Sequence, residues 1–440
     1  MAELELLLLP ASDCHALFSS AAGLHLHQMT HSHKKRVAIV VSHPIQHFVH
    51  FYRALAKEEG IVLRVIYASS IGAKKYFDKD MGVHIQWNTD LLSGYDHVFL
   101  PEADSITSTG FWKINNPSVA AALDEFQPDL VKINGYAQMT MLRALSWCQK
   151  HRVPVVLWSD SELLHARSPL KRALKRVALQ FLFRKIAGCL TVGDNNQDYF
   201  LHYGVPRTRM FRVPFTIDEE SFARAARDRE SLRAAWRSQL GIPHDAFTVL
   251  CVGKLIDRKR PGDLIEAVKI ICERKGTQAP VAVMFAGDGP LRTALDAAAA
   301  PVKDKCCFLG FINVDKLPGV YVTADALAHV SSVDPHPLTT SEAAFVGLPL
   351  IVSDRIGAVG PTDTARPDVN TLVFRCGDKE KLADAIQRLM EDVSLRESMG
   401  KASLKIAGEL NITASVTGFL QAVDSLVILE RSRVRSTVSE

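Results

Sequence analysis

Residues 331–349 read SSVDPHPLTTSEAAFVGLP and are the most informative stretch of this sequence. The apolar run 326–330 before them has the pattern of a strand, and the loop that follows contains Asp334. Residues 339–346 have a helical pattern, with Glu342 expected in the first turn. Two carboxylates at this spacing can act on one ligand, and the amides that begin the helix can bind an anion. The alternative is a helix capped by one of its first threonines, beside a surface acid.

Strand-like runs alternate with helical patterns on both sides of this stretch. This alternation predicts parallel sheets with helices on both faces. A charged, Ala/Arg-rich segment at 219–240 divides the runs into two series, so we expect two doubly wound domains. Such sheets bind ligands at the carboxyl ends of their strands. The predicted strands are 37–41, 62–67, 129–133, 153–157 and 188–192 in the first series, and 248–252, 281–285, 307–309, 326–330, 349–352 and 371–374 in the second.

Composition excludes several classes of protein. The 440 residues are 47% hydrophobic and carry a formal charge of only +4, which does not indicate a nucleic-acid partner. The eight cysteines contain no C-x-x-C pair, so no zinc or redox motif is expected. No run approaches the 18 consecutive apolar residues expected of a membrane-spanning helix. The His-rich segment 1–34 is expected to be a disordered extension.

The strand at 248–252 leads into a basic loop that contains Gly253, Lys254 and Lys259. A glycine lets the backbone approach a ligand closely, and two lysines before a helix suit a diphosphate. A solvated basic loop is the alternative. No G-x-G-x-x-G motif follows the first strand, which counts against a nicotinamide dehydrogenase.

Together these motifs resemble those of the family 4 glycosyltransferases. The family pattern E-x7-E appears here as Asp334-x7-Glu342, and its G-[RK]-x4-K loop appears as Gly253-Lys254-x4-Lys259. The likeness continues through 287–290, 309–311, 347–354 and 377–389, and it covers about 185–410.

The resemblance implies the α/β GT-B architecture, in which two Rossmann-like, doubly wound domains face each other across a cleft. We expect residues 35–215 to form the acceptor-binding domain and residues 216–412 the nucleotide-sugar domain. A C-terminal helix at 413–435 should pack back on the first domain.

The resemblance also implies roles for residues of the second domain. Gly253, Lys254 and Lys259 should bind the donor diphosphate, assisted by the amides of Leu338 and Thr339. Glu342 should accept hydrogen bonds from the ribose, and Asp334 should hold a hydroxyl of the donor sugar. The base should contact the backbone of Gly310, Phe311 and Ile312.

Two further catalytic candidates lie in the first domain. Asp160 follows a predicted strand, where relatives place a polar residue near the reacting sugar; its alternative role is a helix N-cap. His43 lies in the first loop and could face the cleft; its alternative is a structural histidine. Residues 78–80 resemble the metal-binding D-x-D motif of another glycosyltransferase fold, but we expect a solvated turn there.

The expected activity is metal-independent and retaining transfer of a sugar from a nucleotide-diphosphate donor, without a cofactor. A UDP-sugar is favoured and a GDP-sugar is the second choice. The expected acceptor is a glycan or lipid-linked intermediate of envelope or polysaccharide assembly. We expect a cytoplasmic protein, and the basic helix at 167–185 could place it on the anionic inner face of the membrane. An ordinary surface helix is the alternative for 167–185.

Two other functions remain open. One is a sugar-nucleotide epimerase of the same architecture, which needs no separate acceptor. The other is a non-catalytic protein that binds a nucleotide sugar.

Overall fold

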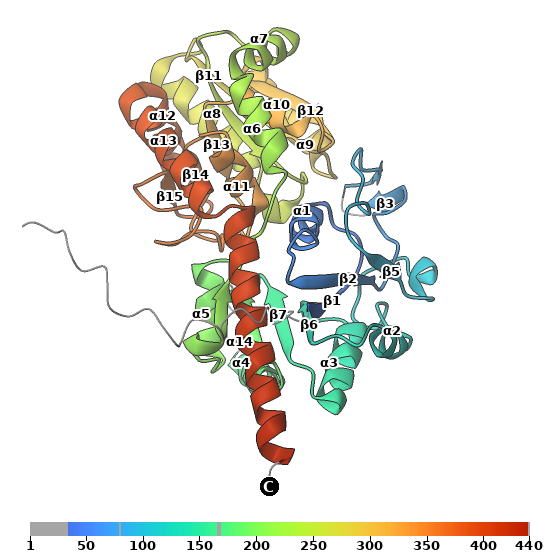
Figure 1. Ribbon diagram of the computed structural model, residues 1–440. Helices are drawn as coiled ribbons and strands as arrows, with labels where there is room; N and C mark the ends of the chain where they lie inside the picture. Colours follow the sequence, from blue (N-terminus) through green and yellow to red (C-terminus); the bar gives the residue numbers. More distant parts are fainter. Residues whose placement is uncertain (1–33, 79–80, 165–168, 439–440) are drawn as a thin grey trace, which may run out of the picture.

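The computed structural model describes residues 34–78, 81–164 and 169–438, and the side chains of these residues except 169–172 and 430–438. The predicted extension at 1–34 therefore lies almost wholly outside the described residues. Figure 1 shows two lobes, one built from each half of the chain, with helix α14 running from one to the other.

The first lobe is built on a parallel sheet of the order β5-β2-β1-β6-β7-β8-β9. Its inner strand β1 has the sequence KRVAIVV, of which Val37 to Val41 are buried, as expected of a strand covered on both faces. The strands are β1 (Lys35–Val41), β2 (Ile61–Tyr67), β5 (His97–Phe99), β6 (Leu130–Asn134), β7 (Val155–Ser159), β8 (Gly188–Thr191) and β9 (Met210–Arg212).

Helices cover both faces of this sheet. One hydrophobic core lies under α1 and α14, and the other lies under the remaining helices of the lobe. A separate antiparallel hairpin, β3 (Tyr76–Asp78) with β4 (Val83–Ile85), projects from the lobe. The helices are α1 (Gln46–Leu55), η1 (Ala103–Ser105), α2 (Val119–Phe126), α3 (Met139–His151), α4 (Pro169–Arg184), α5 (Asp194–His202) and η2 (Arg207–Arg209).

The second lobe repeats this plan around a parallel sheet of the order β12-β11-β10-β13-β14-β15. Its strands are β10 (Phe247–Val252), β11 (Val281–Ala286), β12 (Cys306–Gly310), β13 (Ala326–His329), β14 (Leu350–Ser353) and β15 (Thr371–Phe374). The predicted α/β class with two doubly wound parallel sheets is thus confirmed.

Two hydrophobic cores again flank the sheet, one under α8 and α12 and the other under α6, α10 and α11. The helices of this lobe are α6 (Glu219–Arg227), α7 (Arg229–Leu240), η3 (Asp257–Lys259), α8 (Gly262–Lys275), α9 (Arg292–Ala298), η4 (Ala300–Lys305), α10 (Leu317–Thr323), α11 (Leu338–Phe345), α12 (Lys379–Glu391) and α13 (Val393–Glu409).

Helix α14 (Ile412–Val438) returns to the first lobe and packs on α1 and β9. The approach is close at Gly418, where a Cβ atom would lie 1.9 Å from the carbonyl oxygen of Arg212. Residues Phe419, Ala422 and Val423 are buried in this contact. The stretch Val393–Leu429 is long and apolar enough to cross a membrane by length and composition, which the sequence did not lead us to expect. Of its most apolar window, 44% is buried within the fold.

Candidate functional site

Two adjoining cavities lie where the carboxyl ends of the two sheets meet. The smaller cavity, of about 290 Å³, is lined by side chains of the second lobe, α1, and the segment that begins after β3. The larger cavity, of about 750 Å³, lies between the loops after β1, β6 and β7 and those after β10 and β13. Gly253, Lys254, Leu338 and Thr339 line both, so the predicted diphosphate loop and the start of α11 form a shared wall.

The loop after β10 brings backbone and ammonium groups to this wall. Gly253 has a φ of 140°, which favours glycine, and its carbonyl lies against Gly287 so closely that a Cβ atom there would be 1.9 Å away. Lys254 follows directly, and the short helix η3 places Lys259 one turn later. Two cations and the first amides of α11 therefore face the same space, which suits a diphosphate.

The Lys254 ammonium is paired with a carboxylate of the other lobe. Its Nζ atom lies 2.9 Å from both carboxylate oxygens of Asp78 in β3. The Asp78 side chain is only 13% exposed, so the expectation of a solvated turn at 78–80 is wrong for Asp78. Lys79 and Asp80 lie outside the described residues.

The second predicted lysine belongs to a buried polar network. Lys259 Nζ donates to Asp334 Oδ2, and His329 Nε2 lies 2.9 Å from the same oxygen. Thr339 Oγ1 lies 3.0 Å from His329 Nδ1. Burial raises the pKa of Asp334, but the hydrogen bond from His329 and the charge of Lys259 outweigh it, so the net pKa is well below the usual range. Asp334 is therefore held as a carboxylate beside the candidate sugar site.

Glu342 lines the smaller cavity from α11. The helix begins at Leu338, one residue earlier than expected, so Glu342 is in the second turn and not the first. Its Oε2 atom accepts a hydrogen bond of 2.5 Å from the Tyr321 hydroxyl. Burial raises the pKa of Glu342 to about 7, although the bond from Tyr321 lowers it. The carboxyl group is thus poised between its two protonation states near neutral pH.

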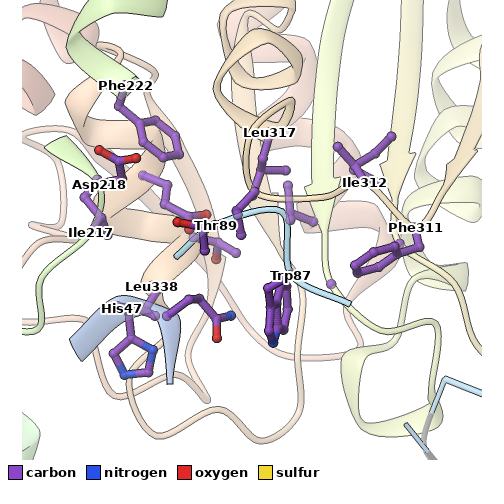
Figure 2. A pocket seen from close by; sticks show the side chains of 18 of the residues that line it. His47, Trp87, Thr89, Ile217, Asp218, Phe222, Phe311, Ile312, Leu317 and Leu338 are labelled. Carbon is purple, nitrogen blue, oxygen red and sulfur yellow. The ribbon is translucent and has the colours of Figure 1, made fainter. Parts of the chain in front are cut away.

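Aromatic side chains from both lobes line the same cavity. The rings of Trp87 and Phe311 have centroids 6.1 Å apart, and Figure 2 shows Ile312 next to Phe311. The lobes are joined at this point, since Asn88 N donates to Asn313 Oδ1 and Asn313 Nδ2 donates to the carbonyl of Gln86. Phe311 and Ile312 line the cavity as expected, whereas Gly310 does not.

The first loop presents a different histidine from the one proposed. His43 lines neither cavity; its Nδ1 atom lies 2.8 Å from the Ser42 hydroxyl, and burial lowers its pKa to about 4. His47, in the first turn of α1, lines both cavities, and burial lowers its pKa to about 3. The proposal for His43 is thus corrected because the chain turns into α1 after Ile45, which directs His47 to the cleft.

Asp160 lines the larger cavity from the loop after β7, as expected. Burial raises its pKa above the usual range. The structure therefore brings Asp160 into the same cavity as Asp334 and Lys259.

Sequence reasoning missed several lining residues. Met81 lies between β3 and β4 and Trp87 follows β4, and no sequence signal places this segment against the other lobe. Asn134 ends β6 and Gln138 follows it. Ligands bind at the carboxyl ends of parallel strands, so the reasoning that located Asp160 after β7 could also have located these two residues.

Within the described residues, no group of three His, Cys, Asp or Glu side chains could hold a metal ion. Metal independence stays a prediction.

Two family models match consecutive parts of the chain. "Glycosyl transferase 4-like domain" matches residues 87–216, and "Glycosyl transferases group 1" matches residues 233–406. Together they cover more than half of the sequence and both lobes of the cleft.

Curated relatives are glycosyltransferases. The chain is 28% identical to a D-inositol 3-phosphate glycosyltransferase of Salinispora arenicola over 239 residues, which are 52% of each chain. It is 33% identical to the lipopolysaccharide core biosynthesis glycosyltransferase LpsD of Rhizobium meliloti over 184 residues, which are 41% of this chain and 50% of LpsD. The chain thus spans about half the length of these relatives.

Solved structures share the whole fold. Anabaena HepE in complex with UDP has a TM-score of 0.68 at 17% identity, with 89% of this chain and 100% of HepE covered. Sucrose-phosphate synthase of Thermosynechococcus elongatus has a TM-score of 0.67 at 18% identity, with 90% and 100% covered. The predicted GT-B architecture is confirmed.

Proposed function

We propose that this chain, which belongs to the family 4 glycosyltransferases of GT-B architecture, transfers a sugar from a nucleotide-diphosphate donor to a glycan or lipid-linked acceptor. A UDP-sugar is the favoured donor and a GDP-sugar the second choice. Structures of the same fold that contain UDP, or UDP-glucose, support a uridine donor.

One observation carries this proposal. Lys254 and Lys259 come from the loop after β10 and Glu342 comes from α11, and all three line the adjoining cavities at the junction of the lobes. The two lysines face the space expected for a diphosphate, and the Glu342 carboxyl group lies in the cavity that the aromatic side chains line. If the base of a nucleotide lies near Phe311, its ribose would be near Glu342 and its diphosphate near the lysines.

Each of these residues has a separate role in the proposed reaction. Lys254 and Lys259 stabilise the charge that develops on the departing diphosphate, a contribution that is large in a site closed to water. Glu342 accepts hydrogen bonds from the ribose, and Asp334 holds a hydroxyl of the donor sugar. Asp160 lies on the acceptor side.

We propose transfer with retention at the anomeric carbon and without a metal. The acceptor oxygen attacks from the face that the diphosphate leaves, so one C–O bond forms as the bond to the diphosphate breaks. The departing diphosphate takes the electron pair and accepts the acceptor's proton. No protein nucleophile is required, since the proton and the charge are both received by the leaving group.

One relative and one helix support the proposed acceptor class. LpsD acts in lipopolysaccharide core biosynthesis, which supports an envelope or polysaccharide acceptor. On α4, Leu174, Val177 and Phe181 are 73%, 68% and 62% exposed and share one helix face. Arg176, Arg184 and Lys185 are exposed beside them. We propose that this face contacts an anionic membrane from the cytoplasmic side.

The larger cavity favours a transferase over an epimerase of the same architecture. An epimerase needs room only for its nucleotide sugar, whereas here a second cavity of about 750 Å³ adjoins the nucleotide side. Polar side chains of the first lobe line it, as a separate acceptor requires.

Nucleotide binding and turnover test the proposed function. We expect UDP, among UDP, GDP, ADP, dTDP and NAD, to raise the melting temperature of the protein but not of Glu342→Ala. A ligand at 100 times its Kd stabilises a fold by about 2.7 kcal/mol, which such a scan detects. Glu342→Ala and Lys259→Ala should also abolish sugar transfer while both variants remain folded.

Other outcomes would change the conclusion. Stabilisation by GDP alone would indicate that the donor is a GDP-sugar and not a UDP-sugar. No stabilisation by any nucleotide would contradict the proposal, and nucleotide-sugar binding without hydrolysis or transfer would favour the non-catalytic alternative.

A further inference from the structure

Buried polar atoms without a partner converge on the larger cavity. In the described part of the chain, five buried side-chain nitrogen or oxygen atoms have no hydrogen-bond partner. Four of these atoms belong to residues that line the larger cavity: Asn134 Nδ2, Gln138 Oε1, Ser159 Oγ and His336 Nδ1. The fifth is the Tyr52 hydroxyl, which interacts with the Asn134 side chain beneath the cavity, so these two groups are neighbours. Because a buried polar group without a partner costs free energy, the three remaining atoms in one cavity indicate a ligand that supplies their hydrogen bonds.

The surrounding bonds determine which side-chain atoms are available to a ligand. Lys132 Nζ donates to Asn134 Oδ1, and the Asn134 side chain also interacts with the Tyr52 hydroxyl, so Asn134 is engaged within the first lobe. Gln138 Nε2 donates to the carbonyl of Thr109 at 3.4 Å, which leaves Oε1 as an acceptor. Ser159 Oγ can donate or accept. Gln138 and Ser159 therefore offer an acceptor and a group that can both donate and accept.

The first-lobe wall of the cavity carries no cation among its described residues. Its titratable members are His47, whose pKa is lowered to about 3 by burial, and Asp160. Lys132 is fully buried beneath this wall, and its Nζ atom lies 4.1 Å from the centroid of the Trp158 ring. Burial lowers its pKa well below the usual value. Lys254, Arg258 and Lys259 line the cavity from the opposite, second-lobe wall, beside the proposed diphosphate.

We infer that Gln138 and Ser159 bind the reacting end of the acceptor, and that this end is an uncharged polyhydroxyl group, a sugar or cyclitol without a phosphate. The inference rests on the proposed function and specifies the acceptor of that site. A hydroxyl both donates and accepts, so neighbouring hydroxyls satisfy Gln138 Oε1 and Ser159 Oγ together. A phosphate only accepts, and it would face Gln138 Oε1 and the Asp160 carboxylate without a compensating cation.

Matched pairs of acceptors test the class. The probes are glucose, galactose, N-acetylglucosamine and myo-inositol, each offered free and as its monophosphate to the full chain saturated with UDP. Saturation-transfer NMR measures their binding, and UDP-sugars replace UDP to measure transfer. We expect at least one uncharged probe to bind and to accept sugar, and its phosphate to bind at least tenfold more weakly.

Two variants test the residues. Gln138→Ala and Ser159→Ala should each weaken binding of the uncharged probe about three- to tenfold, as expected for one lost hydrogen bond, with the Kd for UDP unchanged within about twofold. Gln149→Ala is the matched control, because Gln149 lies exposed at the far end of α3 and donates to the carbonyl of Lys185.

The outcomes separate this inference from the proposed function. If UDP binds but no uncharged probe does, or if a phosphate binds better than its parent, the inference is wrong and the donor site stands. Unchanged probe binding in both Gln138→Ala and Ser159→Ala would also overturn it. If UDP itself does not bind, the proposed function fails first.

Discussion

At the residue scale, the nucleotide side of the cleft depends on one partly buried carboxyl group. Glu342 is held by the Tyr321 hydroxyl and lies in a cavity lined largely by apolar and aromatic side chains. Burial disfavours its charged form, so its pKa rises to about 7. Because ribose hydroxyls bind best to an ionised carboxylate, donor binding and the protonation of Glu342 should be linked.

We expect the affinity for UDP-glucose to fall as the pH is lowered below about 7, by up to tenfold per pH unit. UDP-glucose is the suitable probe because its diphosphate has no group that titrates in this range. Titration calorimetry across about pH 5.5 to 8 measures the effect, and Tyr321→Phe should move its midpoint upward because the Tyr321 hydroxyl lowers the pKa of Glu342.

Glu342→Gln is the control for this experiment, and its affinity should not vary with pH. A wild-type affinity that is equally flat would contradict the linkage. The same raised pKa means that the folded protein binds more protons than the unfolded chain between about pH 4.5 and 7. The contribution of Glu342 to the free energy of unfolding therefore decreases as the pH rises through that window.

At the scale of single elements, the β3–β4 hairpin and the segment after it connect the lobes over the smaller cavity. Asp78 pairs with Lys254, and the Gln86–Asn88 segment is bonded to Asn313. An incoming diphosphate would therefore compete with Asp78 for the same ammonium group. We therefore expect this ion pair to weaken donor binding.

We expect Asp78→Asn to tighten the binding of UDP-glucose about three- to tenfold, because the variant keeps the shape but removes the competing charge. Calorimetry on the folded variant measures the change. Asp96→Asn removes a carboxylate that pairs with Arg64 in the same lobe and should have no effect. Weaker binding in Asp78→Asn would mean that Asp78 helps to hold the donor.

Helix α4 is the second element to which we assign a role, the proposed membrane contact. Among its described side chains Leu179 and Phe183 are buried, whereas Leu174, Val177 and Phe181 are on the outside. Replacing all three by serine should abolish sedimentation with vesicles that contain an anionic lipid, without loss of UDP binding. Leu404→Ser on α13 is the control, since Leu404 is 50% exposed on the other lobe. Equal sedimentation of the triple variant would contradict the membrane proposal.

At the scale of the whole molecule, α14 ties the second lobe to the first. It starts where Glu219 Oε1 accepts a hydrogen bond of 2.5 Å from the amide of Ile412, and it then packs along β9 and α1. Small residues allow this approach: a Cβ atom at Gly188 in β8 would lie 2.9 Å from Leu426. The geometry of the cleft therefore depends on a helix that is remote from it in sequence (Figure 1).

We expect Gly418→Ala to destabilise the protein by roughly 1–3 kcal/mol, because its Cβ atom would meet the backbone of Arg212. Gly408→Ala on α13 is the control. No atom lies within 4 Å of a Cβ at Gly408, and alanine should stabilise the helix there by about 0.5–1 kcal/mol. Thermal unfolding measures both, and a Gly418→Ala variant as stable as wild type would contradict the close packing.

The sequence by itself determined the strand and helix alternation, the α/β class and the position of the basic loop that we propose binds a diphosphate. These follow from local patterns: buried parallel strands appear as continuous apolar runs, and a strand that ends in glycine and lysine before a helix marks an anion site. It also located Asp160, because the carboxyl ends of parallel strands lie at one edge of a sheet.

Only the tertiary structure decided which side chains meet across the cleft. It paired Lys254 with Asp78, 176 residues away in sequence, and brought Trp87 to Phe311. It turned His47 rather than His43 toward the cavities, and it left Gln138 Oε1 and Ser159 Oγ without partners in one of them. These contacts depend on how two separately folded sheets are placed by α14 and the β3–β4 hairpin, and no local pattern encodes that placement.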